Sequence, residues 1–228
     1  MTKNQNYSVL IIDDHPLITE AYINALNYTS KENSKIAFDI ETVNNCDDAC
    51  FKIKEATKRV KKFDLIFLDI KLPPSKDGRI ISGEGLGLKI NSLLPESKII
   101  ISTTFNDNYR IHCIFQNINP DGFLIKNDIN LEELISAIKT VLFNPPYYSK
   151  TVIKQLRKEV SNDLLLDKID RKLIYELSLG TKTKDLPSIL PLSIAGIEKR
   201  KRHLKEVFDI STKDDRSLIA IAREKGFI

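Results

Sequence analysis

The sequence predicts an α/β fold, a doubly wound five-stranded parallel sheet, followed by a small all-α domain of four helices. Short apolar runs alternate with segments of helical spacing over the first 145 residues, which indicates strand–helix crossovers. From Leu166 onward only helical spacing recurs. The length of 228 residues suits two modest domains.

Five segments have the composition of strands. Ile36–Val43 mixes apolar and acidic residues, as expected near a sheet edge. The other four are short and rich in Ile, Leu and Phe, which is typical of strands buried on both faces: Ser8–Ile12, Leu65–Leu68, Ile99–Ser102 and Gly122–Ile125.

Helical spacing fills the intervals between these strands. Leu131–Phe143 is the clearest helix, because Asn130 can cap it, Glu133 follows three residues later, and its apolar residues form one stripe. The remaining segments with this spacing are Leu17–Leu26, Asp48–Val60, Leu86–Leu94 and Tyr109–Gln116.

The proline pair after Asn144 ends the first domain, since proline stops a helix. We therefore expect a domain over 1–145, a linker over 146–163 with a short helix near Val152–Val160, and a helical domain over 164–228. The helices expected in the last domain are Ile169–Leu179, Lys184–Leu190, Ser193–Phe208 and Asp214–Lys225.

Composition and charge narrow the function classes. No apolar run approaches the roughly 18 residues of a membrane helix, the N-terminus does not read as a signal peptide, and three cysteines cannot form a disulfide framework. These features predict a cytoplasmic protein with reduced thiols and no membrane partner. Residues 1–145 carry 17 basic and 19 acidic side chains, and residues 146–228 carry 18 and 12. The basic excess favours either a nucleic-acid module or a solvated basic face at the C-terminal end.

Polar residues follow several of the predicted strands. Asp13 and Asp14 follow the first strand, Asp69 the third, Thr103 the fourth and Lys126 the fifth. Ligands of open parallel sheets bind outside the carboxyl ends of the strands. Clustered carboxylates need a cation, and Mg²⁺ prefers oxygen ligands, so one carboxylate could attack a phosphoryl group there. Taken singly, each of these residues could instead be a turn residue, a helix cap or a solvated lysine.

Four segments, VLIIDDHPL, LIFLDIKLP, IIISTTF and GFLIKNDI, give residues 7–143 a resemblance to the receiver domain of two-component response regulators. The resemblance implies the flavodoxin-like strand order 2-1-3-4-5, for which receivers are a known example. It also implies Asp69 as phospho-acceptor and three sets of supporting groups: Asp13, Asp14, Asp69 and the backbone carbonyl of Lys71 as Mg²⁺ ligands, Thr103 and Phe123 as switch residues, and Lys126 as the phosphate-binding lysine.

The chain departs from the receiver pattern after the acceptor. Lys71–Glu84 forms an apparent insertion before the Gly-led helix. It is either a tolerated surface insertion or a flap that selects partners or shields the phosphate.

The predicted helix Ser193–Phe208 is strongly basic and of a size that fits the DNA major groove. A solvated basic helix is the alternative interpretation. Residues 164–228 resemble the LuxR-type helix-turn-helix of the NarL/FixJ-like class, through the frames LLLDKIDRKLIYELSLGTKTKDL, LSIAGIEKRKRHLKEVFDI and IAIAREKGFI. The resemblance makes this segment the recognition helix. We expect base contacts from Lys199 and Arg202, and phosphate contacts from Arg200, Lys201 and Lys205.

Three residues depart from the helix-turn-helix pattern. Glu198 stands where the family usually has a phosphate-binding lysine, Gly196 lowers helix propensity, and Pro187 requires a helix that starts late after Asp185. We expect an altered sequence preference or a weaker affinity for DNA.

The sequence therefore predicts a response regulator that a sensor histidine kinase phosphorylates on Asp69 and that binds double-stranded DNA as a homodimer. It would not be an enzyme, apart from catalysing its own phosphorylation and dephosphorylation. Two alternatives stay open, an Mg²⁺-dependent phosphohydrolase with an aspartate nucleophile and a receiver adaptor whose tail binds protein.

Overall fold

The computed structural model describes residues 5–58, 62–105, 108–160, 166–210 and 214–228. The chain divides into two compact units, residues 1–106 with 114–152 and residues 107–113 with 153–228. The expected domain limits, 1–145, 146–163 and 164–228, remain predictions. The limit between 163 and 164 lies outside the described residues. Val60, the predicted last residue of the helix that begins at Asp48, also lies outside them.

The first unit is built on a parallel sheet of order β2-β1-β3-β4-β5-β6, which is the predicted doubly wound order with one strand added. The edge position of β2 confirms the interpretation of its mixed composition. The strands are β1 (Gln5–Ile12), β2 (Ile36–Val43), β3 (Leu65–Asp69), β4 (Lys98–Thr103), β5 (Gly122–Ile125) and β6 (Tyr147–Tyr148).

The expected count of five strands is wrong, because the described residues form six. The additional strand β6 lies in the segment predicted to be a linker and pairs in parallel with β5. The amide of Tyr147 donates to the carbonyl of Asp121 at 2.9 Å, and the amide of Ser149 donates to that of Phe123 at 2.9 Å. A strand of two residues is too short to show an alternating pattern, so sequence periodicity could not reveal it.

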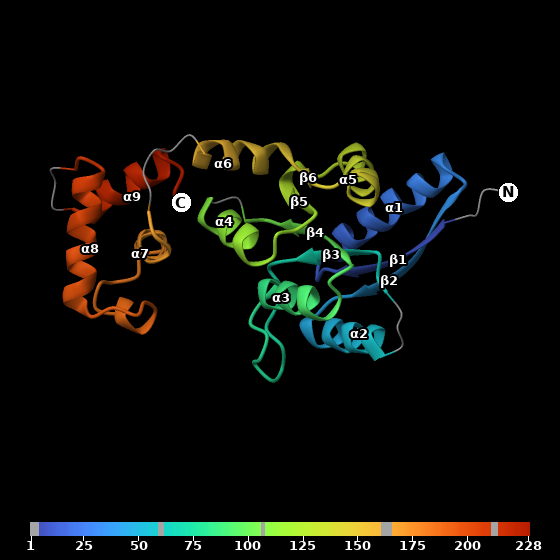
Figure 1. Cartoon of the computed structure of the whole chain (residues 1–228), viewed down its shortest axis with the longest axis horizontal. Helices are drawn as coiled ribbons and strands as arrows, with labels where there is room; N and C mark the ends of the chain where they lie inside the picture. The colour runs from blue at the N-terminus through green and yellow to red at the C-terminus, as the bar shows by residue number, and fades with distance from the viewer. Residues whose placement is uncertain (1–4, 59–61, 106–107, 161–165, 211–213) are drawn as a thin grey trace. The chain divides into compact units, whose positions relative to one another are not determined.

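Helices α1 and α5 lie together on one face of the sheet, and α2 and α3 lie together on the other (Figure 1). All five expected helices are confirmed, Leu131–Phe143 with the expected bounds and the other four with shifted ends. The side chain of Asn130 caps α5 by accepting from the amide of Glu133 at 2.8 Å. The helical segments are α1 (Pro16–Glu32), α2 (Cys46–Lys58), α3 (Gly83–Leu93), α4 (Asn108–Asn117), the 3-10 turn η1 (Lys126–Asp128), α5 (Leu131–Phe143) and α6 (Lys150–Val160).

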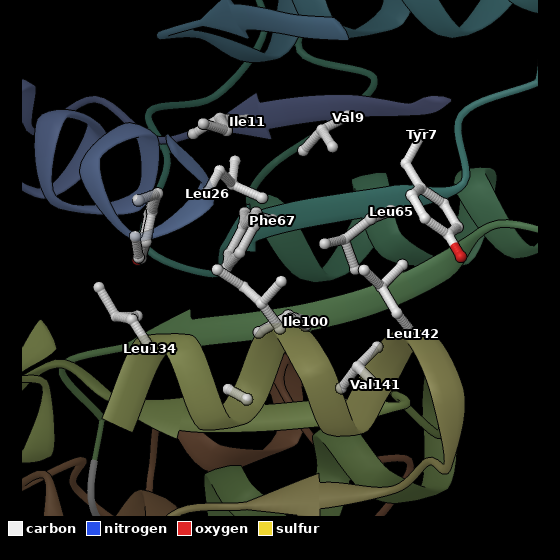
Figure 2. Packing of buried hydrophobic residues seen from close by; sticks show 14 of the residues in the cluster. Tyr7, Val9, Ile11, Leu26, Leu65, Phe67, Ile100, Leu134, Val141 and Leu142 are labelled. Atoms are coloured by element: carbon white, nitrogen blue, oxygen red, sulfur yellow. The ribbon is translucent and has the colours of Figure 1, made fainter. Parts of the chain in front are cut away.

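The main core fills the space between the sheet and the pair α1 and α5. Alternate residues of β1, β3 and β4 point toward these helices, as the period of two in a strand requires (Figure 2). Each fully buried large apolar side chain contributes about 1.5–3 kcal/mol. The labelled members of this cluster are Tyr7, Val9, Ile11, Leu26, Leu65, Phe67, Ile100, Leu134, Val141 and Leu142.

The second unit takes in the start of α4 and most of α6, and it contains α7 (Lys168–Ser178), the 3-10 turn η2 (Leu186–Ser188), α8 (Ile194–Val207) and α9 (Asp215–Glu224). The side chains of Asp167, Ser193 and Asp214 cap the three α-helices. Their apolar faces pack into one core: Leu173, Ile174, Leu177, Leu186, Leu190, Ile197, Leu204, Phe208, Leu218, Ala222 and Phe227.

The helix expected over Lys184–Leu190 is a single 3-10 turn, which corrects that prediction. Pro187 lies in its first turn, as expected of a late start, but the side chain of Asp185 makes no capping bond. Pro191 lies three residues beyond this turn and limits its extension, because proline has no amide hydrogen to donate. No helix among the described residues is long and apolar enough to cross a bilayer.

We predict that Gly83→Ala destabilises the protein. A Cβ at Gly83 would stand 1.9 Å from the backbone oxygen of Asp69, so β3 and α3 would have to separate. Such overpacking costs about 1–3 kcal/mol, measured as the free energy of unfolding in urea. Gly85→Ala in the same helix is the control, since its Cβ would lie 3.7 Å from Ile80 in ordinary contact. Equal stabilities of the two variants would contradict the prediction.

Candidate functional site

The carboxyl ends of the central strands gather charged side chains at one edge of the sheet. Asp13 follows β1 directly, Asp69 is the last residue of β3, and Lys126 follows β5. Asp13 prolongs the pairing of β1 with β2, because its amide donates to the carbonyl of Val43 at 3.2 Å. The parallel register therefore brings together residues that lie more than fifty positions apart in sequence.

Lys126 links the two buried carboxylates of this edge. Its Nζ lies 2.7 Å from Asp69 Oδ2 and 2.8 Å from Asp13 Oδ2. The side chain of Lys126 is 5% exposed and those of Asp13 and Asp69 are each 1% exposed. One ammonium group thus faces two buried carboxylates, and with Asp14 the acids outnumber it further.

Asp69 is held in two ways. Burial raises the pKa of its carboxyl group, while hydrogen bonds from Lys126 and from the backbone of Lys71, together with the charge of Lys126, partly oppose that shift. The amide of Lys71 donates to Oδ1 at 2.8 Å, so the ammonium group and the amide engage different oxygens. The orientation of the carboxylate is therefore fixed.

His15 belongs to the same cluster. Its Nδ1 lies 2.6 Å from Asp14 Oδ1 and 3.2 Å from Asp13 Oδ1. Possible ligand atoms of Asp13, Asp14, His15 and Asp69 all lie within 4.8 Å of one another. His15 was not among the site residues predicted from the sequence, although its position between the acidic pair and Pro16, the first residue of α1, was the available signal. The cluster opens into a groove of about 590 Å³ that Asp13 and Asp14 line together with α1 and α2 residues.

The two predicted switch residues are buried on β4 and β5. Thr103 ends β4, and its hydroxyl oxygen accepts from the amide of Phe105 at 3.1 Å. Phe123 is fully buried, with its ring centroid 5.4 Å from that of Phe115. Phe115 in turn meets Tyr148 of β6 edge to face at 5.0 Å. The strand missed by sequence reasoning thus forms part of the packing around Phe123.

The predicted insertion contains an ordered turn. Ser75 and Ile80 bond across it, with the amide of Ser75 donating to the carbonyl of Ile80 at 2.8 Å. The hydroxyl of Ser75 donates to Asp77 at 2.6 Å, and Ile80 is buried. The amide of Lys76 reaches Asp47 of α2 at 3.2 Å, and Figure 1 shows the segment between β3 and α3 projecting as a long loop. The tolerated surface insertion and the flap that selects partners or shields the phosphate both remain predictions for this segment.

The five predicted DNA-contacting cations of α8 have different surroundings. Lys199 and Arg202 are exposed. Arg200 Nη1 lies 2.7 Å from both Asp167 and Asp170 of the same unit. The remaining two meet Asp215, with Lys201 Nζ 2.6 Å from Oδ2 and Lys205 Nζ 2.8 Å from Oδ1.

These ion pairs shift the ionisation of their members. The hydrogen bonds that Arg200 donates to Asp167 and Asp170 raise the pKa of Arg200. Burial alone would lower the pKa of Lys201, but bonds to Asp215 and Glu198 outweigh it and raise the value. Burial likewise would raise the pKa of Asp215, yet the two lysines lower it. Sequence spacing could not reveal these pairs, since Arg200 and Asp170 lie 30 positions apart.

Comparisons with known proteins agree with this geometry. Residues 9–139 match the family described as response regulator receiver domain. The oxygen regulatory protein NreC of Staphylococcus epidermidis is 26% identical over 96% of this chain and 98% of its own length. NreC of Staphylococcus carnosus is 24% identical over the same shares.

The likeness to solved structures concerns the fold. One similar structure is that of RcsB from Salmonella enterica serovar Typhimurium, bound to promoter DNA in the presence of the phosphomimetic BeF3⁻. The superposition has a TM-score of 0.62 at 17% sequence identity, and it covers 95% of this chain and 98% of the RcsB chain. Another structure, of two RcsB dimers bound to two parallel DNAs, has a TM-score of 0.57 at 16% identity, with 96% and 98% covered. The family match covers more than half of the chain and includes the strand ends that bring Asp13, Asp69 and Lys126 together. This protein therefore belongs to the response regulator receiver family.

Proposed function

We propose that this chain is a DNA-binding response regulator that a sensor histidine kinase phosphorylates on Asp69. The observation that carries the proposal is the pair of contacts from Lys126, at 2.7 Å to Asp69 and 2.8 Å to Asp13. A phosphorylated histidine would give up its phosphoryl group to a carboxylate oxygen of Asp69, so that the N–P bond breaks and an acyl phosphate forms. Lys126 then balances charge on the new phosphoryl oxygens.

The donor set fits Mg²⁺. Asp13, Asp14 and Asp69 supply carboxylate oxygens within one small cluster, and three acids against Lys126 leave negative charge to neutralise. The backbone carbonyl of Lys71 is the further proposed ligand. A bound Mg²⁺ would supply charge neutralisation for the incoming phosphoryl group. His15 is the one nitrogen donor of the described cluster, at 2.6 Å from Asp14.

Phosphorylation would be transmitted through Thr103 and Phe123. The hydroxyl of Thr103 now accepts from Phe105, and a phosphoryl group on Asp69 offers it an acceptor oxygen instead. Movement of Thr103 would alter the packing of Phe123 against Phe115, and so the α4 and β5 face of the receiver. This repacking is the proposed trigger for homodimer formation.

The second unit is the proposed output module. This unit contains the basic helix α8, which Ser193 caps. RcsB, which shares the fold at a TM-score of 0.62, is bound to promoter DNA in its own structure. Two copies would place two α8 helices in paired half-sites of a duplex. Such a regulator would act in the cytoplasm, and it would act on no substrate besides its own phosphoryl group. The segment Ile70–Leu72 offers no carboxylate for a phosphohydrolase mechanism.

We predict that Asp69→Ala abolishes labelling by a radioactive small phosphodonor such as acetyl phosphate. The carboxylate is the acceptor, so the variant has no oxygen to form the acyl phosphate. Asp185→Asn is the control, because Asp185 is an exposed aspartate of the second unit. Retained stoichiometric labelling of Asp69→Ala, with an acid-stable and hydroxylamine-labile bond, would contradict the assignment.

We predict that Asp69→Asn stabilises the protein in EDTA at neutral pH. Burial raises the pKa of Asp69 in the folded state, so the folded protein binds a proton more readily there than the unfolded chain does. The wild type therefore loses stability as the pH rises through the window above the ordinary aspartate pKa of about 4, and the variant does not.

The measurement is the free energy of unfolding in urea between pH 3 and pH 8, the range that brackets this window. The advantage of the variant should vanish at the acidic end, and Mg²⁺ should stabilise the wild type more than the variant. An advantage that is the same at every pH would contradict the electrostatic cause.

Arg200, Lys201 and Lys205, the cations expected to contact phosphates, are held by carboxylates of their own unit, whereas Lys199 and Arg202 are exposed and can meet phosphates as well as bases. We therefore predict that Lys199→Ala and Arg202→Ala each weaken duplex binding and reduce its salt dependence. Each exposed cation that neutralises a phosphate contributes about 0.9 to the slope of log affinity against log salt concentration. Fluorescence anisotropy between 50 and 200 mM salt gives the slope for each variant. Lys168→Ala, at the start of α7, is a charge-matched control. A wild-type slope near zero would favour the adaptor whose tail binds protein.

A further inference from the structure

The exposed side of α8 carries two acids, Glu198 and Glu206, among its cations. Arg200, Lys201 and Lys205 turn toward carboxylates of their own unit, which removes three of the five cations of this helix from the solvent face. The residues left exposed follow one stripe: Ile194, Ala195, Glu198, Lys199, Arg202, His203 and Glu206.

Glu198 is held in place on this stripe. Its Oε1 lies 3.2 Å from Lys201 Nζ, and its side chain is 51% exposed. Lys201 is 8% exposed and is itself fixed by Asp215 at 2.6 Å and by the hydroxyl of Thr183 at 3.2 Å. The buried lysine therefore anchors one oxygen of Glu198 while half of the side chain faces outward. An anchored side chain loses less conformational freedom when it binds.

A carboxylate on a DNA-facing stripe cannot contact phosphates favourably, because like charges repel. The major groove offers it hydrogen-bond donors instead, and the amino group N4 of cytosine is the usual partner of Glu. Glu198 lies in the N-terminal half of α8, the part of a recognition helix that meets base edges. Arg202 follows one turn later on the same face, where it can contact guanine or phosphate.

We propose that Glu198 is a specificity-determining residue that accepts a hydrogen bond from N4 of a cytosine in the major groove, with Lys201 fixing its carboxylate. This assignment rests on the proposed DNA-binding function. Glu198 replaces the lysine that the family usually has at this position. In this assignment the replacement gives up one phosphate contact and adds a contact that discriminates between bases.

The test is selection of bound duplexes from a randomised pool by the full-length chain, with Mg²⁺ and acetyl phosphate present. The wild type should enrich cytosine at one position in each half-site. Glu198→Gln should lose that preference by roughly 5- to 150-fold, the worth of one good base contact, and should favour adenine there, because Gln pairs with adenine edges. Glu206→Gln, which removes the same charge from the same stripe, should select the wild-type sequence.

Two outcomes would overturn the proposal, and they are distinguishable. A Glu198→Gln variant that selects the wild-type sequence, with affinity changed equally on all duplexes, would show that Glu198 acts only through its charge. Failure of the wild-type chain to bind any duplex would overturn the proposed DNA-binding function and this assignment with it. Because Glu198 is exposed, thermal melting of its Gln variant should match that of the wild type, so a folding defect is separately visible.

Discussion

The contact of Lys126 with Asp13 and Asp69 is the constraint on which the first unit depends. Losing Lys126 would leave two buried carboxylates without a counterion, and breaking a buried ion pair in this way costs about 3–5 kcal/mol. Three strand ends must therefore stay in register to within a hydrogen-bond distance. The apolar core beneath β1, β3 and β4 supplies the rigidity that keeps them there. The same arrangement leaves excess negative charge at the strand ends, and this charge is the basis of the proposed Mg²⁺ site.

In the proposed function, close packing around Phe123 would pass a change at the phosphorylation site on to neighbouring elements. Phe123 is fully buried and its ring packs against Phe115, which in turn meets Tyr148. In a close-packed interior a side chain cannot shift gradually; it changes from one discrete packing arrangement to another. In the proposed function, a change at Thr103 would therefore act on β5, β6 and α4 together. The two-residue strand β6 matters here because it carries Tyr148 into that packing.

Local signals in the sequence predicted much of the fold and of the strand-end cluster. Four of the five predicted strands are largely buried on both faces, and Asn130 and Ser193 are capping residues, so their patterns were complete within a few positions. What escaped prediction depends on distant partners or on very short elements. The strand β6 has two residues, and the turn η2 is shaped by Pro187. The Arg200 pairs with Asp167 and Asp170 exist only once α7 and α8 pack.

The same lesson applies to charge. The basic excess of residues 146–228 drew attention to α8, yet Arg200, Lys201 and Lys205 form ion pairs within their own unit, where they help to hold helices together. Few cations of α8 remain exposed, and counterion release, the part of DNA affinity that ignores sequence, scales with phosphate contacts. A recognition helix with fewer of these contacts must take more of its binding from base edges and DNA shape. On such a helix an exposed, anchored acid contributes more to sequence discrimination than another cation would. A cation that binds backbone phosphates contacts every sequence alike, whereas an acid accepts hydrogen bonds only from particular base edges.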